Sequence, residues 1–507
     1  MVSRIIGLIR EMVFAAFFGV SADMDVFLLA QVLPCTISTV LATSILAAFI
    51  PVYSRHMAKN GLQAGSELAN RIVSGIFALA TVFSILAYFA APGLAALLVP
   101  DWPQETRTKT IELVRILLPC FTGTLLLAVF NGVQQAGHRF IFPYLGPIVF
   151  NLTIVVSVLV FGTTGNIYVL GNATTVGVLL QIMIQLYGLN QMHFKFSFVQ
   201  PTSIFPKELM AFLLPALMVT IIVDAAFIID RMFVSLLPTG SIAALNYAYR
   251  VNSLTVNLVA NSIAAGSYPV IAACVGRADY NEMNRNIGLS IRMALFATIP
   301  AMVLILAFSE PIIDLLFQRG SFGATAVAKT SMALFFLSFG MLGAGVLGIL
   351  GQANCALQKS GLLLRVAAAM ITVKLALSLA FVRIMAADGL ALATSGAYLV
   401  GGGALLWLWN KDSNTAGAKI WRSAKQSIVA AGIMGLSSKV FFYLVGIAIL
   451  PAIMSSPIMA DRVGLIVTVC FAGAVYLGVL AYVKSEGFEW AREIFLRSKT
   501  KLEILWR

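Results

Sequence analysis

The chain is 507 residues long, with 60% hydrophobic and 11% charged residues. A soluble domain carries charge on roughly one quarter of its residues, so this composition excludes an ordinary soluble protein. The formal net charge of +13 is assigned to basic loops and a basic tail that contact anionic lipid headgroups, rather than to nucleic-acid binding.

Apolar stretches of about 20 residues recur from end to end, and each is long enough to cross a bilayer. Arg4 sits too close to the start for a separate cleavable signal peptide. The sequence predicts an all-α integral membrane protein. It has about fourteen transmembrane helices, near 1–20, 26–52, 72–99, 111–133, 143–162, 167–189, 209–236, 241–272, 288–317, 327–356, 361–383, 388–409, 427–450 and 463–483.

Short motifs recur at an offset of about 220 residues. Ile9-Arg10-Glu11-Met12 is echoed by Ile229-Asp230-Arg231-Met232, and Ala42–Ile45 by Ala260–Ile263. Two related halves are a common design among transporters. We therefore predict two pseudo-symmetric six-helix bundles, 1–200 and 201–410, followed by two more helices and a basic tail in 411–507.

The distribution of basic residues predicts the orientation in the membrane. With a cytoplasmic N-terminus, the outer loops hold only Arg107, Lys109, Arg319, Arg383 and Arg462. The inner loops and the tail hold many more, among them Arg55, Lys59, Arg71, Arg139, Lys207, Arg277, Arg285, Lys359, Lys411, Lys419, Arg422 and Lys425. This positive-inside bias favours two cytoplasmic termini.

Motifs for enzymatic chemistry are missing from the sequence. The five cysteines form no C-x-x-C pair, and no His/Cys cluster, nucleotide-binding loop or paired catalytic carboxylates stand out. We predict a transporter rather than an enzyme, with no metal site, no catalytic residues and no cofactor, although a coupling cation is left open.

Charged residues inside the predicted spans are the candidates for function, because burying them in a bilayer is costly. They are Arg4, Arg10, Asp25, Asp224, Asp230, Arg231, Arg250 and Lys374. The alternative is that they form closed ion pairs that lock helices together. Neighbours on a helix point in different directions, so we expect neither Arg10–Glu11 nor Asp230–Arg231 to close on itself.

The arginines suggest the charge of the substrate. The planar guanidinium binds phosphate through two hydrogen bonds and stays charged at any working pH. A central cavity with Arg4, Arg10 and Arg250 would attract an amphiphile bearing a diphosphate and repel a hydrophobic cation.

Several motifs of the chain match those of a known family. They are Ser3–Gly7 with Arg10-Glu11, Phe17–Gly19, Ala22–Phe27, Ala48–Pro51, Arg115–Asn151 and Tyr247–Arg250. In these motifs the chain resembles the MurJ (MviN) lipid II flippases. The resemblance covers about the first twelve spans. It implies flipping of an undecaprenyl-diphosphate-linked peptidoglycan precursor across the bacterial inner membrane, by two bundles that rock between inward-open and outward-open states.

The resemblance also implies roles for single residues. Arg4, Arg10 and Arg250 would contact the diphosphate, Asp25 would help an outer gate, and the last two helices would form a groove for the lipid tail. We further expect a monomer whose partners are the substrate and membrane lipids, with no nucleic acid.

Two features depart from the family pattern. The segment Ser38–Ser44 has no charge where the family usually carries basic residues, so a related lipid-linked saccharide is an alternative substrate. Lys374 is unexpected in mid-helix; we hypothesise that its ammonium pairs with Asp230 at the position that a coupling cation would otherwise occupy. A multidrug or cation antiporter stays open as an alternative because of Asp25, Asp224 and Asp230. A non-transporting membrane scaffold is a third alternative, although it would not need arginines inside the membrane.

Overall fold

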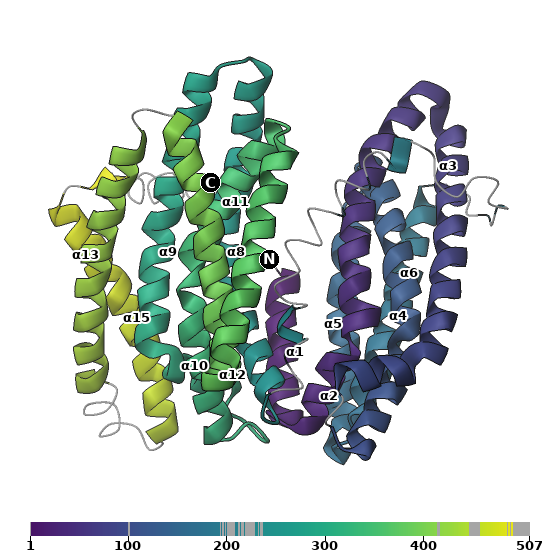
Figure 1. Ribbon diagram of the computed structural model, residues 1–507, viewed down its shortest axis with the longest axis horizontal. Helices are drawn as coiled ribbons and strands as arrows, with labels where there is room; N and C mark the ends of the chain where they lie inside the picture. Colours follow the sequence, from purple (N-terminus) through teal and green to yellow (C-terminus); the bar gives the residue numbers. More distant parts are fainter. Residues whose placement is uncertain are drawn as a thin grey trace, which may run out of the picture. The chain divides into compact units, whose positions relative to one another are not determined.

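The computed structural model describes residues 2–99, 102–192, 194, 197, 199, 208–210, 213, 217, 229–231, 233, 237–412, 416–445, 457–483, 485, 486, 488 and 489. Helices account for all regular structure within these residues (Figure 1). They are α1 (Val2–Phe18), α2 (Ala22–Ala30), α3 (Ser38–Leu98), α4 (Gln104–Ala136), α5 (Ile141–Phe161), α6 (Tyr168–Gln191), α8 (Ser241–Gly276), α9 (Tyr280–Phe317), α10 (Ala324–Ser338), α11 (Gly340–Ala356), α12 (Ser360–Asp412), α13 (Ala416–Phe442) and α15 (Pro457–Tyr482).

Most of these helices have the length and apolar composition of membrane spans. The described residues contain nine such helices, and α10 with α11, bent by 45° between them, makes up to a tenth. The protein is thus an all-helical, multi-pass membrane protein, which confirms the predicted fold class. The predicted span at 209–236 lies largely outside the described residues.

Two helices each contain a pair of predicted spans. The helix α3 leaves helical geometry only at Gly61 (φ 86°, ψ 172°), between the spans predicted at 26–52 and 72–99. The helix α12 does so at Ala386 (φ 49°, ψ −124°), between the spans at 361–383 and 388–409. The predicted connecting loops are helical on either side of one residue, because hydropathy locates apolar windows in the chain and not the ends of its helices.

The start of α4 shows the same effect. The apolar window predicted a span from 111, but the helix begins at Gln104. Its polar first turns are held by Lys109, whose Nζ lies 3.2 Å from the Glu105 carboxylate and 3.3 Å from that of Asp23. The helix therefore runs past the apolar stretch, and Lys109 belongs to a helical turn rather than to a loop.

The first of two compact units comprises Met1–Tyr247, Phe317–Ala326 and Val382–Ala387. Within it, α4 packs against α3 and α6, and α5 packs against α6 and α1 (Figure 1). Between α2 and α3, the chain makes one π-helical turn, Val32–Ile37. Phe49, Ile72 and Val129 lie at the centre of its core, where the apolar faces of α3 and α4 meet.

The second unit comprises Ala248–Leu316, Val327–Phe381 and Asp388–Arg507. One core joins α8, α9, α11 and α12 around Ile287, Ile349 and Leu405. Another joins α9 to α13 and α15, where the Tyr476 hydroxyl donates a 2.7 Å hydrogen bond to the Phe296 carbonyl. The last two helices thus belong to this unit, while the predicted bundle boundaries near 200 and 410 stay predictions.

Candidate functional site

The helix α1 carries two predicted substrate ligands. Arg4 is exposed, and the Arg10 side chain is 14% exposed. The Arg10 guanidinium lies 2.6 Å from the Glu11 carboxylate and 5.4 Å from the centre of the Phe14 ring. The expectation that Arg10 and Glu11 do not pair is wrong, because the long arginine side chain reaches across the helix surface to its neighbour.

Glu11 belongs to a buried polar group that we call the Glu11 cluster: Arg10, Glu11, Arg231 and Asn246. The Asn246 amide nitrogen donates to Glu11 Oε2 at 3.5 Å, and its oxygen accepts from Arg231 at 3.4 Å. Glu11, Arg231 and Asn246 are each at most 5% exposed. Buried charges persist where they are paired and hydrogen-bonded, so this cluster ties α1 to the first turns of α8.

Asp230, a predicted coupling residue, is likewise buried and precedes Arg231 in the chain. Together with the Glu11 cluster it makes a set of two arginines and two carboxylates with no formal net charge. The sequence predicts Arg10 and Asp230 as functional residues, but neither Glu11 nor Asn246. For Glu11, the sequence signal is its position next to Arg10, an arginine in the middle of a predicted span. Asn246 is neutral, so no charge pattern indicates it.

Asp25, predicted to act at an outer gate, binds the start of α8. It is 2% exposed, and its carboxylate accepts hydrogen bonds from the backbone N–H groups of Gly240 and Ala243, the latter at 2.8 Å. The first N–H groups of a helix have no intrahelical acceptor, and a carboxylate there also offsets the positive end of the helix dipole. Asp25 thus joins α2 to the N-terminus of α8.

Close backbone packing surrounds this junction. The Ser321 N–H donates to the Ala16 carbonyl at 2.8 Å, and the Tyr247 hydroxyl donates to the Gly19 carbonyl at 3.3 Å. Gly320 has φ +54°, and a Cβ there would lie 2.2 Å from the Ala16 carbonyl oxygen. Only glycine fits such a position without moving the backbone.

Lys374 lies in the second unit, fully buried on α12. Its ammonium donates to the Leu390 carbonyl at 2.8 Å and to the Thr394 hydroxyl, which is 2.7 Å from the hydroxyl of Tyr249. Oxygen atoms of this kind also coordinate small cations. The predicted Lys374–Asp230 pair would join residues of different units and stays a prediction.

Arg250, on α8, is exposed and belongs to the second unit. The predicted cationic site of Arg4, Arg10 and Arg250 would combine residues of both units, so it stays a prediction. Asp224 lies outside the described residues. Within the described part of the chain, no three His, Cys, Asp or Glu side chains are grouped to hold a metal ion.

Comparison with known proteins identifies the family. The family model "Lipid II flippase MurJ" matches residues 14–481. The chain belongs to the MurJ lipid II flippase family. It is therefore a transporter of peptidoglycan biosynthesis and not an enzyme, as the sequence predicted.

Curated relatives of the MurJ family are distant but cover most of the chain. A probable lipid II flippase MurJ of Thermotoga maritima is 26% identical over 79% of this chain and 81% of its own length. A second, of Rhizobium tropici, is 25% identical over 82% of this chain and 81% of its own length. The lipid II flippase MurJ of Burkholderia cenocepacia is 23% identical over 77% of this chain and 78% of its own length.

Solved structures show the same fold. A lipid II flippase MurJ in an inward closed conformation matches with a TM-score of 0.79, at 22% identity over 95% of this chain and 97% of that one. An inward-facing multidrug MATE transporter of the MOP superfamily matches with a TM-score of 0.68, at 15% identity over 83% of this chain and 96% of that one. MurJ proteins and MATE transporters thus share the architecture of this chain.

Proposed function

We propose that this protein moves lipid II, the undecaprenyl-diphosphate-linked peptidoglycan precursor, from the inner to the outer leaflet of the bacterial cytoplasmic membrane. The observation that carries the proposal is the family match over residues 14–481. The chain would act as a monomer, with both termini in the cytoplasm, as the positive-inside bias predicts.

In the proposed mechanism, the two halves alternate between inward-open and outward-open states around a central cavity. Arg4, Arg10 and Arg250 contact the diphosphate, for which the guanidinium is well suited. The exposure of Arg4 and Arg250 supports such a role. Arg10 already has Glu11 as a counter-ion, so its phosphate contact would compete with that pair, and the three arginines would not contribute equally.

A related lipid-linked saccharide is the second candidate substrate. The segment Ser38–Ser44, at the start of α3, carries no charge. Its exposed Thr39 and Thr43 hydroxyls donate to the carbonyls of Cys35 and Thr39, at 2.7 Å and 2.9 Å, within the same helical stretch. This helix face offers a headgroup only hydroxyl groups, which favours neutral sugar contacts over phosphate contacts here.

Complementation tests the proposal. The chain would be expressed in bacteria depleted of their own lipid II flippase, alongside Arg10→Ala, Arg250→Ala and the control Arg55→Ala, an exposed arginine of α3. We expect growth with the wild type and the control, and loss of growth with Arg250→Ala at equal expression. Arg10→Lys should retain more function than Arg10→Ala, because it keeps the charge.

The outcomes separate the candidates. Failure of a well-expressed wild type to support growth would overturn lipid II as the substrate. A search for another lipid-linked saccharide in accumulated precursors would then follow. Growth that survives both alanine substitutions would remove the arginines from the mechanism while leaving the flippase function intact. Drug resistance conferred by the wild type without rescue would favour the antiporter alternative.

A further inference from the structure

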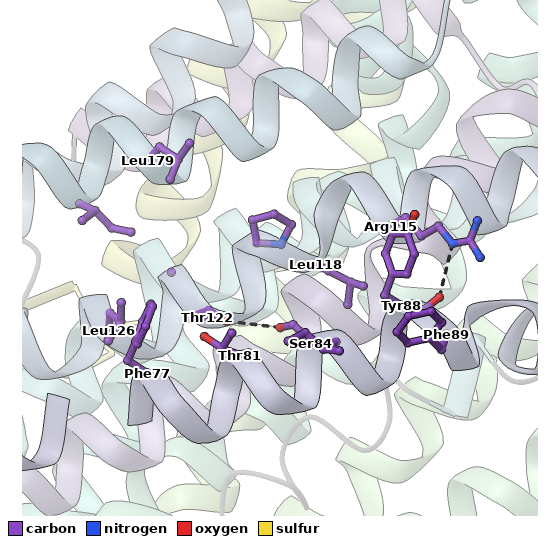
Figure 2. A pocket seen from close by; sticks show the side chains of 14 residues that line it. Phe77, Thr81, Ser84, Tyr88, Phe89, Arg115, Leu118, Thr122, Leu126 and Leu179 are labelled. Atoms are coloured by element: carbon purple, nitrogen blue, oxygen red, sulfur yellow. Dashed lines mark hydrogen bonds between the residues drawn. The ribbon is translucent and has the colours of Figure 1, made fainter. Parts of the chain in front are cut away.

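An open apolar groove of about 670 Å³ lies in the first unit, between the second half of α3, the middle of α4 and α6. Its walls include Phe77, Ile85 and Phe89 from α3, Leu126 from α4, and Leu179 and Ile182 from α6 (Figure 2). The volume is that of a site for a sizeable small molecule. Since α3, α4 and α6 are all membrane spans, the side chains exposed along this groove meet lipid rather than water.

One end of the groove is cationic. Arg115 and Tyr88 lie there, away from Phe77 and Leu126 at the opposite end (Figure 2). Arg115 Nε donates to the Tyr88 carbonyl at 3.3 Å, and its guanidinium carbon is 4.5 Å from the centre of the Tyr88 ring. These contacts fix the guanidinium on the aromatic face and leave its two terminal nitrogens available.

Arg115 has no carboxylate partner among the described residues. Glu112, the nearest acid along α4, instead accepts a hydrogen bond from the Tyr168 hydroxyl. A guanidinium in a membrane span is costly unless it reaches an anion or the headgroup level. The apolar stretch of α4 begins near 111, so Arg115 lies about 6 Å inside it at 1.5 Å per residue, a depth from which an arginine side chain reaches the headgroups.

The length of the groove fits one lipid chain. From Tyr88 to Phe77 the groove follows α3 for about 16 Å at 1.5 Å per residue. Half the thickness of a bilayer core is about 15 Å, so the groove is about as long as one leaflet is thick. A cation within reach of the headgroups, followed by an apolar channel of this length, complements an anionic headgroup and its acyl chain.

We propose that this groove is a binding site for an anionic membrane phospholipid, with the headgroup phosphate on Arg115 and one acyl chain along Phe77, Ile85 and Leu126. The guanidinium supplies the charge-assisted hydrogen bonds that suit a phosphate. The hydroxyls of Ser84 and Thr122, which also line the groove, form a 3.3 Å hydrogen bond with each other, so neither is left without a partner beside the acyl chain. This inference does not depend on the proposed function, since the groove lies wholly within α3, α4 and α6.

Native mass spectrometry of the purified full chain, titrated with phosphatidylglycerol or phosphatidylcholine of identical chains, tests the proposal. We expect phosphatidylglycerol to bind about tenfold more tightly, as a charge-assisted contact to phosphate without a compensating choline allows. Arg115→Gln should remove that preference, and Arg55→Gln should keep it. Thr81→Trp, which fills the groove, should weaken both lipids. Equal binding of the two lipids by the wild type would overturn the proposal.

Location is tested separately, by cross-linking a phosphatidylglycerol with a photoreactive acyl chain. Adducts on the α3 peptide containing Phe77 to Phe89, reduced in Thr81→Trp, are the expected result. Adducts elsewhere, unchanged in Thr81→Trp, would contradict the site. Displacement of the lipid by a stoichiometric amount of a polyprenyl diphosphate would overturn the assignment to phospholipid. Each variant is used only if its unfolding temperature without added lipid matches that of the wild type.

Discussion

Glu11 and Arg231 bind the two ends of a single side-chain amide, that of Asn246. They occupy corresponding positions in the internal repeat, where Arg10-Glu11 is echoed by Asp230-Arg231 with the charges exchanged. Asn246 suits both partners because its amide has a donor and an acceptor. The repeat therefore places an acid and a base on the same asparagine.

Replacing Asn246 by Leu should destabilise the protein by about 1–3 kcal/mol, because buried charged groups of Glu11 and Arg231 each lose a hydrogen-bond partner. Thermal unfolding in detergent measures the change. Asn172→Leu is the matched control, since among the described residues that exposed amide donates only to the Tyr168 carbonyl of its own helix. Equal unfolding temperatures for the two variants would show that the Glu11 cluster contributes no stability.

Asp25→Ala should loosen the N-terminus of α8 and cost about 1–2 kcal/mol, the usual loss when a capping side chain is removed. Hydrogen exchange of the Ala243 amide should accelerate, because that N–H loses its acceptor. Ser21→Ala makes a local comparison: Ser21 Oγ accepts from the Met24 N–H at the start of α2, so its loss should affect α2 and leave α8 protected. Unchanged exchange at Ala243 in Asp25→Ala would refute the capping role.

Lys374→Ala should make the stability of the protein depend on small monovalent cations. The Leu390 carbonyl and the Thr394 hydroxyl would each lose the ammonium as a hydrogen-bond donor, although the Thr394 hydroxyl would still donate to the Leu390 carbonyl. A cation could occupy the vacated position. Unfolding temperatures measured in sodium, potassium and N-methylglucamine chlorides check this. The wild type and Lys329→Ala, a change at an exposed lysine, should respond equally to all three salts. If Lys374→Ala does the same, the idea of a tethered cation is wrong.

Gly320→Ala should destabilise the protein by more than about 1 kcal/mol, because the left-handed backbone and the nearby Ala16 carbonyl both oppose a Cβ. Gly323→Ala is the control, as a Cβ there meets nothing within 4 Å. Urea unfolding of the two variants in the same detergent gives the comparison. A smaller effect at Gly320 than at Gly323 would contradict the close approach.

Hydropathy predicts the membrane spans because the bilayer core requires a helix of about 20 mostly apolar residues, and hydropathy measures that property directly. It could not predict that α3 and α12 continue between the predicted spans up to Gly61 and Ala386, since hydropathy alone does not distinguish a helix from a loop. The cost of burying charge in a bilayer predicts that Arg10, Asp25 and Lys374 are functional residues. Their partners are mostly backbone atoms or neutral side chains, which no charge pattern reveals.

The prediction that Arg10 and Glu11 do not pair is wrong for a physical reason. Helical geometry separates the Cβ directions of adjacent residues, but the flexible arginine side chain is long enough to reach the neighbouring carboxylate at 2.6 Å. Asp25 shows the converse. Its position at the start of the second predicted span was clear from the sequence, whereas the helix N-terminus that it caps lies 215 residues further along the chain.

The Arg10–Glu11 pair has a consequence for the biogenesis of the protein. The first helix leaves the ribosome long before α8 has been made, yet its arginine already has a counter-ion on the same helix. Asp230 and Arg231 likewise bring opposite charges into the membrane next to each other. Each segment enters the lipid with no net charge from these residues, so the insertion machinery need not hold one helix back until its partner arrives.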